Sequence, residues 1–154
     1  MATYAATTSV STEASRSEIE RTLERYKADA FAYSRDGAKS QIAFRMGGRY
    51  YRFVLILPEP TERRFTHHSR GMRTDEAARK EWEQACRQKW RALALVIKAK
   101  LEAVDAGIST VEAEFMAATV LPEGQTVGEW MAPQIDEAYS LGHMPKTLML
   151  EGPR

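Results

Sequence analysis

The alternation of apolar and polar residues between positions 31 and 55 predicts three short strands joined by tight turns. Apolar side chains recur at every second position in the segments 31–33, 41–44 and 51–55. The dipeptides Asp36-Gly37 and Gly47-Gly48 separate these segments, and two-residue Asp-Gly and Gly-Gly loops match the right-handed twist of paired strands. The pattern therefore predicts an antiparallel meander.

The two loops fix which residues lie opposite one another. With the Gly-Gly pair as one loop, Phe44 lies opposite Tyr51; with the Asp-Gly pair as the other, Phe31 lies opposite Ile42. Both hairpins then agree on two faces. The inward face is apolar and carries Phe31, Tyr33, Ile42, Phe44, Tyr51, Phe53 and Leu55. The outward face is polar and basic and carries Ser34, Lys39, Gln41, Ala43, Arg45, Tyr50 and Arg52.

Helical periodicity flanks the predicted sheet on both sides. Ser15 and Ser17 each fit capping-box spacing, which predicts a first helix that begins near one of them and ends near Ala28. Thr74 is a predicted N-cap, with two acidic residues in the first turn of a long helix that runs to Gly107. The apolar stripe of this helix is spaced to lie across a sheet. Its members are Ala78, Trp82, Ala85, Cys86, Trp90, Leu93, Ile97, Leu101 and Val104.

The remaining segments complete an α+β fold class: an N-terminal helix, a three- to four-stranded antiparallel meander, a long helix packed on the sheet, then short C-terminal helices. Residues 63–67 are interpreted as a fourth, edge strand or as a loop, with Phe65 inward. Ser109 with Glu112, and Thr126 with Glu129, predict two capped C-terminal helices, the second of them kinked or restarted at Pro133.

The predicted organisation is one domain over residues 15–142. It has a disordered N-terminal tail at 1–14, because that segment is rich in Ser, Thr and Ala without a period, and an irregular tail at 143–154. Within the domain, the sheet and long helix (30–106) are basic, and a helical appendage (108–142) is acidic.

Charge is distributed unevenly along the chain, although the formal net charge is only +1. Residues 30–100 hold 16 basic and 7 acidic side chains, a net charge of +9, whereas residues 101–154 hold 2 and 9, a net charge of −7. A clustered basic region is the electrostatic footprint of a polyanionic partner. The open alternative is that the acidic C-terminal part packs near the basic middle and neutralises it.

Composition limits the compartment and the class of protein. The chain of 154 residues has a single cysteine, Cys86, so it has no disulfide framework, which indicates a reducing compartment. The N-terminal segment lacks a basic region followed by an apolar run, and no apolar segment approaches the roughly 20 residues that span a bilayer. We therefore expect a soluble, cytoplasmic protein without a membrane partner.

The residues offer no catalytic motif, so we expect no enzymatic activity and no cofactor. The only metal-ligand candidates are His67, His68, Cys86 and His143, and they lack the spacing of a zinc site. The carboxylates of Asp75, Glu76, Glu81 and Glu83 resemble a nuclease set, yet their place at a helix N-terminus has a structural reason. A site assembled from distant residues would leave no local trace.

The residues best suited to bind a ligand are basic and aromatic. Arg45, Tyr50 and Arg52 share the outward face, with a basic loop following the sheet. Cations meet phosphates while aromatic and arginine planes stack on bases, a combination typical of single-stranded nucleic-acid binding. The alternative is a solvated outer sheet face. The predicted nucleic-acid-binding residues are Lys39, Arg45, Arg49, Tyr50, Arg52, Arg63, Arg64, Arg70 and Arg73. The expected partner is single-stranded DNA or RNA, bound without sequence specificity.

The order of a helix, an antiparallel meander and one long helix resembles, in outline, the double-stranded-RNA-binding domain and the Whirly and PUR-type single-strand binders. No lysine-rich helix start of the first family and no repeated PUR unit is present. The arginine-rich strand, basic loop and tryptophan-containing helix also resemble small phage or prophage proteins over much of the chain, which implies a role in phage DNA metabolism or host interference.

A second hypothesis belongs to another class of protein. Acidic helical tails occur in adaptors and inhibitors that mimic or cover another protein's nucleic-acid surface, and a host or replication protein is the expected partner. The predicted contact residues are Glu129, Trp130, Met131, Asp136, Glu137 and Tyr139. A homodimer that pairs the basic sheet of one copy with the acidic helices of another is the third hypothesis.

Overall fold

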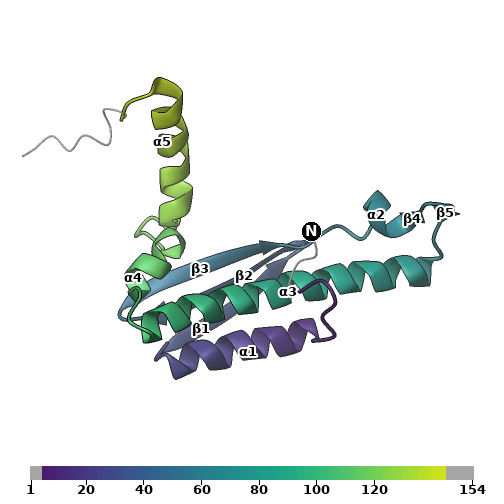
Figure 1. The fold of residues 1–154 in the computed structure, drawn as a ribbon, viewed down its shortest axis with the longest axis horizontal. Coiled ribbons are helices and arrows are strands. Elements are labelled where there is room, and N and C mark those ends of the chain that lie inside the picture. The colour runs from purple at the N-terminus through teal and green to yellow at the C-terminus, as the bar shows by residue number, and fades with distance from the viewer. Residues whose placement is uncertain (1–4, 145–154) are drawn as a thin grey trace, which may run out of the picture.

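Eleven elements make up the computed structural model, which describes residues 5–144. In chain order they are α1 (Thr12–Arg25), β1 (Ala30–Asp36), β2 (Lys39–Met46), β3 (Arg49–Ile56), α2 (Arg63–Thr66), β4 (His67–His68), β5 (Gly71–Met72), α3 (Asp75–Asp105), α4 (Val111–Glu114), the 3₁₀ turn η1 (Met116–Ala118) and α5 (Val127–Leu141). The predicted α+β class is confirmed. Helices α1 and α3 lie side by side against one face of the sheet β1-β2-β3, and α5 extends away from that layer (Figure 1).

The β2–β3 hairpin has the predicted register. Phe44 pairs with Tyr51 and Arg45 with Tyr50. Gly47 and Gly48 both have positive φ angles, 58° and 76°, as a type I′ turn requires at its two central residues. A local turn preference therefore sets this half of the sheet.

The β1–β2 hairpin corrects the predicted loop. Asp36 pairs with Lys39, so the loop is Gly37-Ala38 and not Asp36-Gly37, and Phe31 lies opposite Phe44 rather than Ile42. Only the first loop residue, Gly37, has a positive φ, 57°, which is the pattern of a type II′ turn with glycine first. Moving the loop by one residue moves every partner by two, so the two faces of the sheet are preserved.

The core lies between the inward face of the sheet and the helices α1 and α3. Its sheet residues Ile42, Phe44 and Tyr51 are at most 1% exposed. The helices contribute Ile19, Leu23, Cys86, Trp90, Ala94, Ile97 and Leu101. The inward residues of β1 are less covered: Phe31 is half-buried and Tyr33 is 38% exposed, whereas Tyr51 of the other edge strand, β3, is 1% exposed and packs on Phe115.

The N-terminal helix begins earlier than predicted. Its N-cap is Ser11, whose hydroxyl accepts from the Ala14 N–H, and the helix ends at Arg25 rather than near Ala28. Ser15, a predicted cap, is buried within the helix. The segment before the helix packs on α3, because Gln84 Nε2 donates to the carbonyls of residues 6 and 8 at 3.4 and 3.0 Å. This contact differs from the tail predicted for 1–14; residues 1–4 and 145–154 lie outside the described part.

The segment after the sheet contains neither a fourth strand of the main sheet nor an irregular loop throughout. Residues 63–66 form the single helical turn α2, and the two-residue strands β4 and β5 form a small separate ladder. The strand prediction was wrong here, whereas Phe65 is buried as expected. Helix α3 follows as predicted, with Thr74 as N-cap, and ends at Asp105.

The C-terminal segment returns to the sheet before it leaves again as α5. The N-cap of α4 is Thr110, one residue after the predicted Ser109. Thr119 then bridges Tyr51 at the edge of β3. The Thr126–Glu129 capping box is present, and α5 continues through Pro133 as one helix instead of restarting there. Its first turn packs tightly on η1, since a Cβ at Gly128 would lie 3.0 Å from the Ala117 carbonyl oxygen.

Candidate interaction surfaces

The outer face of the sheet places Arg45 next to Tyr50, and it also supplies a carboxylate to the arginine. Arg45 Nε donates to Asp29 Oδ1 at 2.8 Å, and Arg45 Nη1 donates to the Tyr50 hydroxyl at 3.2 Å. The hydrogen bond from Arg45 lowers the pKa of the Asp29 carboxyl and raises the pKa of the guanidinium. This predicted phosphate contact is therefore already paired within the chain.

Two arginines of β3, Arg52 on the outer face and Arg49 at the β2–β3 turn, pair with the acidic C-terminal unit. Arg52 Nη2 donates to Glu129 Oε2 at 2.9 Å, and its Nη1 donates to the Gly124 carbonyl at 2.8 Å. Arg49 lies 3.4 Å from Glu112. The pKa of Glu129 is lowered chiefly by the Thr126 backbone N–H, and then by the charge of Arg52. At Arg49 and Arg52, therefore, the acidic C-terminal part packs near the basic middle of the chain and neutralises it, as the alternative interpretation of the charge pattern states.

The other predicted members of the sheet face remain exposed. Tyr50 is 52% exposed and its ring lies 5.7 Å from the Arg45 guanidinium carbon. Lys39 opens β2 at the opposite end of the strand from Arg45 and is exposed. No carboxylate of residues 5–144 lies within 4.0 Å of its amine. Lys39 therefore keeps its amine available, whereas the Tyr50 hydroxyl accepts from Arg45, and the two side chains lie at different ends of the sheet.

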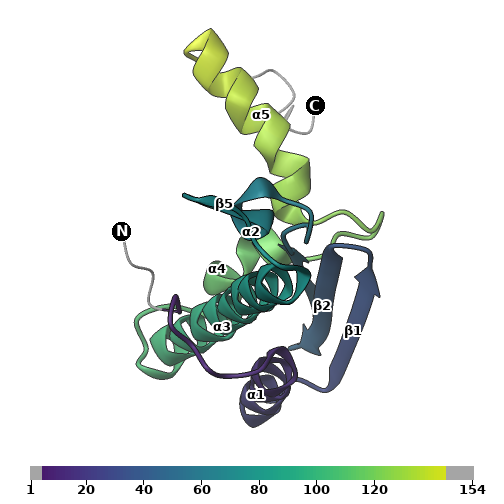
Figure 2. The same ribbon diagram turned by 90° about the vertical axis from the view of Figure 1, so that its right-hand side faces the viewer.

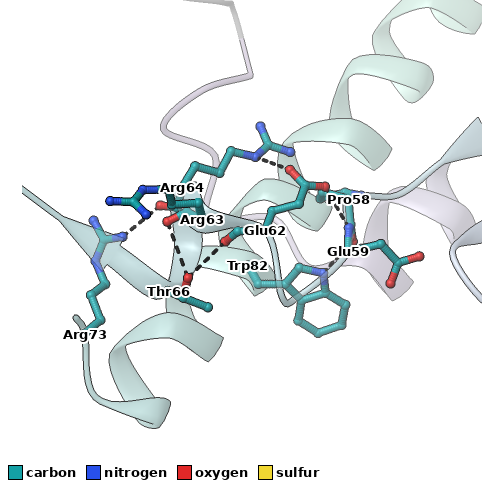
Figure 3. Close-up of polar contacts among 8 residues, drawn as sticks. All are labelled: Pro58, Glu59, Glu62, Arg63, Arg64, Thr66, Arg73 and Trp82. Carbon is teal, nitrogen blue, oxygen red and sulfur yellow. Dashed lines mark hydrogen bonds and ion pairs between the residues drawn. The ribbon is translucent and has the colours of Figure 1, made fainter. Parts of the chain in front are cut away.

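The basic loop residues lie around α2, at the far end of α3. Arg64 Nε donates to Glu62 Oε2 at 2.7 Å, and Glu62 also accepts from the Glu59 N–H (Figure 3). Arg73 Nη1 donates to the carbonyls of Arg64, Phe65 and His67 at 2.6–3.1 Å, so it connects the segment just before α3 to α2 and β4. Arg63 and Arg70 are exposed, and neither has a carboxylate within 4.0 Å in the described part of the chain.

The nine predicted nucleic-acid-binding residues therefore do not form one surface. Figure 1 shows the β2–β3 turn and the α2–β5 segment at opposite ends of the long helix α3. The group at the β2–β3 turn is paired with carboxylates, whereas the group at α2 retains Arg63 and Arg70. The two groups are close to each other in the sequence. In the structure they lie at opposite ends of the 31-residue helix α3 (Figure 1).

Helix α5 presents the residues of the second hypothesis. It has no buried residue, and it points away from the sheet and α3 (Figure 2). Trp130 is 45% and Tyr139 is 87% exposed. Asp136 and Glu137 are exposed and have no ion pair within the described residues, whereas Glu129 is held by Arg52. The prediction omitted two exposed apolar residues of the same helix, Ile135 and Leu141, at 46% and 50%; helical periodicity from Trp130 and Met131 was the signal that could have found them.

A third group of arginines was not predicted as a site. Arg16 of α1, Arg35 of β1 and Arg87 of α3 line one cavity of about 380 Å³ together with Tyr33 and other side chains. No local sequence signal joins them, because they come from three elements and only the packing of α1 on the sheet and α3 brings them together. None of the three lies within 4.0 Å of a carboxylate in residues 5–144.

Metal and membrane sites are not indicated in the part of the chain that the structure covers. No cluster of three or more His, Cys, Asp or Glu side chains is close enough there to bind a metal ion. The described helices include none with the length and apolar character needed to cross a bilayer. Burial raises the pKa of the Cys86 thiol.

Comparison with protein-family models, with curated proteins and with solved structures finds no match to this chain.

Proposed function

We propose that the protein is a protein-binding module that docks on its partner through α5. The observation that supports this proposal is a 15-residue helix with no buried side chain and with four exposed large apolar residues. Isolated helices of this length are marginal in water, and Pro133 in the interior removes a further hydrogen bond. Packing of these apolar side chains on a partner would supply the stability that most of the helix lacks within its own chain.

The charge of α5 specifies the chemistry of that partner. Residues 127–144 contain Glu129, Asp136 and Glu137 and no lysine or arginine. Pairing α5 with α5 of a second copy would set these carboxylates against their own kind, which is unfavourable. The occupant we propose is a different protein with an apolar groove flanked by basic side chains, into which α5 inserts in the helix-in-groove mode. A host or replication protein with a nucleic-acid-binding surface has this chemistry.

Affinity capture followed by direct measurement tests the proposal. The full chain is immobilised, captured proteins are identified and purified, and the affinity of each for the chain is measured by calorimetry. The critical variant is Ile135→Glu, which charges the apolar stripe; the matched control is Ser140→Glu, which adds the same charge on the opposite side of α5.

We expect Ile135→Glu to weaken binding of the true partner at least about 10-fold, because a charge replaces a buried anchor. We expect Ser140→Glu to change it less than about 3-fold. If the Ile135→Glu variant captures the same proteins as the native chain, with the same affinity, the proposal is contradicted. A concentration-dependent dimer of the purified chain that Ile135→Glu abolishes shows instead that a second copy occupies the helix.

Nucleic-acid binding is the second candidate, and exposed arginines around α2 favour it. Arg63 and Arg70 have no carboxylate within 4.0 Å among residues 5–144, and Met72 nearby is 75% exposed. Fluorescence anisotropy with single-stranded DNA, duplex DNA and RNA at two salt concentrations tests it. Binding that weakens steeply with salt and is reduced by Arg63→Ala with Arg70→Ala supports this candidate. Absence of binding to all three nucleic acids at low salt excludes it.

A further inference from the structure

The cavity of about 380 Å³ lies where the start of α1, the edge strand β1 and the first half of α3 meet. Its volume is within the range of roughly 300–1,000 Å³ that is usual for small-molecule sites. Aromatic side chains form part of its wall: Tyr33, Trp82 and Trp90. The Trp82 ring is fixed because its Nε1 donates to the Pro58 carbonyl at 2.8 Å, so this wall is preformed.

Three arginine side chains line the cavity. The Arg16 guanidinium carbon lies 4.3 Å from the Tyr33 ring centroid, an orientation that holds the cation over the ring. Arg35 Nε donates to the Gly37 carbonyl at 3.1 Å, and Arg87 donates to Gln84 Oε1 at 2.6 and 2.9 Å. Each guanidinium has five N–H donors, so most of their donors are left for a ligand.

The absence of carboxylate partners distinguishes these three arginines from those of the outer sheet face. In the described part of the chain no carboxylate lies within 4.0 Å of Arg16, Arg35 or Arg87. Burial raises the pKa of the Cys86 thiol, which lines the same cavity, while the charges of Arg35 and Arg87 lower this pKa and that of Glu83 raises it. The lining holds three arginines and two carboxylates, a formal charge of +1, which favours an anion.

The start of α1 contributes its helix dipole at the cavity. Ser11 and Thr12, at the N-terminal end of the 14-residue helix α1, line the cavity. The helix dipole favours negative charge at this end. This helix end supplements the arginines. The combination of guanidinium groups and a helix N-terminus is suited to a phosphate, because arginine donates to phosphate oxygens in a bidentate manner.

Two carboxylates also line the cavity. One is Glu83, which lies 3.6 Å from Arg79, a residue that does not line the cavity. The other is Glu13, whose pKa is lowered chiefly by its backbone hydrogen bond at the helix start. Both side chains remain hydrogen-bond acceptors. Acceptors beside aromatic walls suit a planar ring with exocyclic N–H donors, as in adenine, guanine or cytosine.

We propose that this cavity binds a 5′-phosphorylated nucleoside, with the phosphate on Arg16, Arg35 and Arg87 and the base against the aromatic wall. The same chemistry is present in a free nucleotide and at the 5′ end of a nucleic-acid strand. The site is separate from α5, so it goes beyond the proposed protein-binding function and is tested independently of it.

Calorimetric titration of the full chain tests the ligand class with four probes: adenosine 5′-monophosphate, adenosine, inorganic phosphate and a 5′-phosphorylated single-stranded oligonucleotide. We expect the monophosphate to bind with a Kd below about 1 mM. We expect adenosine and inorganic phosphate each to bind at least about 10-fold more weakly, because each lacks one half of the contacts. A 5′-phosphorylated oligonucleotide that binds more tightly than the monophosphate identifies the strand end as the source, whereas binding of the monophosphate alone identifies the free nucleotide.

Charge-removing variants test the location of the site. Arg87→Gln and Arg35→Gln each weaken binding of the monophosphate about 10-fold. The matched control is Arg21→Gln, which removes the same charge from α1 outside the cavity lining, and it changes the affinity less than about 2-fold. Far-UV circular dichroism confirms that the variants are folded. The proposal is overturned if neither the monophosphate nor the phosphorylated oligonucleotide binds the native chain, if inorganic phosphate binds as tightly as the monophosphate, or if Arg21→Gln costs as much affinity as the cavity variants.

Discussion

The arginines of β2 and β3 and those of the cavity between α1, β1 and α3 carry the same charge in different surroundings. Arg45, Arg49 and Arg52 each lie within 4.0 Å of a carboxylate, at 2.8, 3.4 and 2.9 Å. The three cavity arginines have no such partner within residues 5–144. The first group stabilises the attachment of neighbouring segments, and the second leaves its donors available for an anion.

The contrast shows that arginine content alone does not identify a binding face. The carboxylates that pair with the sheet arginines come from distant parts of the chain, 16 residues away for Asp29 and 77 residues away for Glu129. A solvated or ligand-binding arginine and an internally paired one look the same in sequence. Only the tertiary contacts with Asp29, before β1, and with the C-terminal unit distinguish them.

The largest expected effect comes from detaching the C-terminal unit from the sheet. Phe115 is 1% exposed and its ring centroid lies 5.6–6.0 Å from those of Phe44, Tyr51 and Phe53. Phe115→Ala should lower the free energy of unfolding by about 3–5 kcal/mol, because it leaves a cavity in this cluster. Urea denaturation followed by circular dichroism measures the loss. Val54→Ala on the outer face is the control, and an equal loss in that variant would contradict the role of Phe115.

Next in size is the effect of Arg52→Ala, which removes the bonds from β3 to Gly124 and Glu129. We expect a loss of about 1–2 kcal/mol, after allowing for solvent screening of the half-exposed carboxylate. Arg49→Ala should cost at most about 0.5 kcal/mol, since its pair is exposed on both sides. Equal losses in the two variants would show that the ion pairs of this face do not differ in strength. The same urea titrations provide the measurement.

Acid should remove the stabilisation of the paired face. The pKa values of Asp29 and Glu129 are lowered in the folded chain, so their contribution is complete above their unfolded pKa values and is lost as the pH falls through the folded ones. We expect the stability difference between the native chain and Arg52→Ala to narrow below about pH 4. Urea titrations at pH 7 and pH 3 measure it. A difference that is constant across this range would refute the linkage.

The smallest expected effect has the opposite sign and belongs to the cavity. Arg35→Gln keeps a donor for the Gly37 carbonyl and removes one of the three positive charges that line the cavity. At low ionic strength we expect a gain of about 0.3 kcal/mol in the free energy of unfolding. At high salt the gain should vanish, because the repulsion is screened. Thermal unfolding at two salt concentrations tests this, and a loss above about 1 kcal/mol would mean that Arg35 is paired in solution.

Local rules predicted the parts of the fold that local geometry controls. The Gly47-Gly48 turn fixed the β2–β3 register, and Thr74 and Thr126 are N-caps as expected. The β1–β2 loop was misplaced by one residue, because both Asp-Gly and Gly-Ala fit a two-residue turn and only strand packing chooses between them. The start of α1 was misplaced because Ser11, Ser15 and Ser17 all resemble caps; Ser15 is instead buried in the helix.

The candidate sites were less predictable than the fold. Which face each sheet residue occupies follows from a period of two, so the positions of Arg45, Tyr50 and Arg52 on one face were predictable. Their pairing with Asp29 and Glu129 was not, since long-range ion pairs leave no periodic signal. The exposure of α5 was equally hidden, because an amphipathic pattern normally indicates a buried stripe.

The sequence by itself determined the α+β class, the meander, the two faces of the sheet and the capped helices, because turn geometry, side-chain alternation and capping act over a few residues. The tertiary structure alone decided which charges are available. It set the acidic C-terminal unit against Arg49 and Arg52, left α5 with no buried residue, and brought Arg16, Arg35 and Arg87 to one cavity. These outcomes depend on how separate elements pack, and electrostatic availability is a property of that packing.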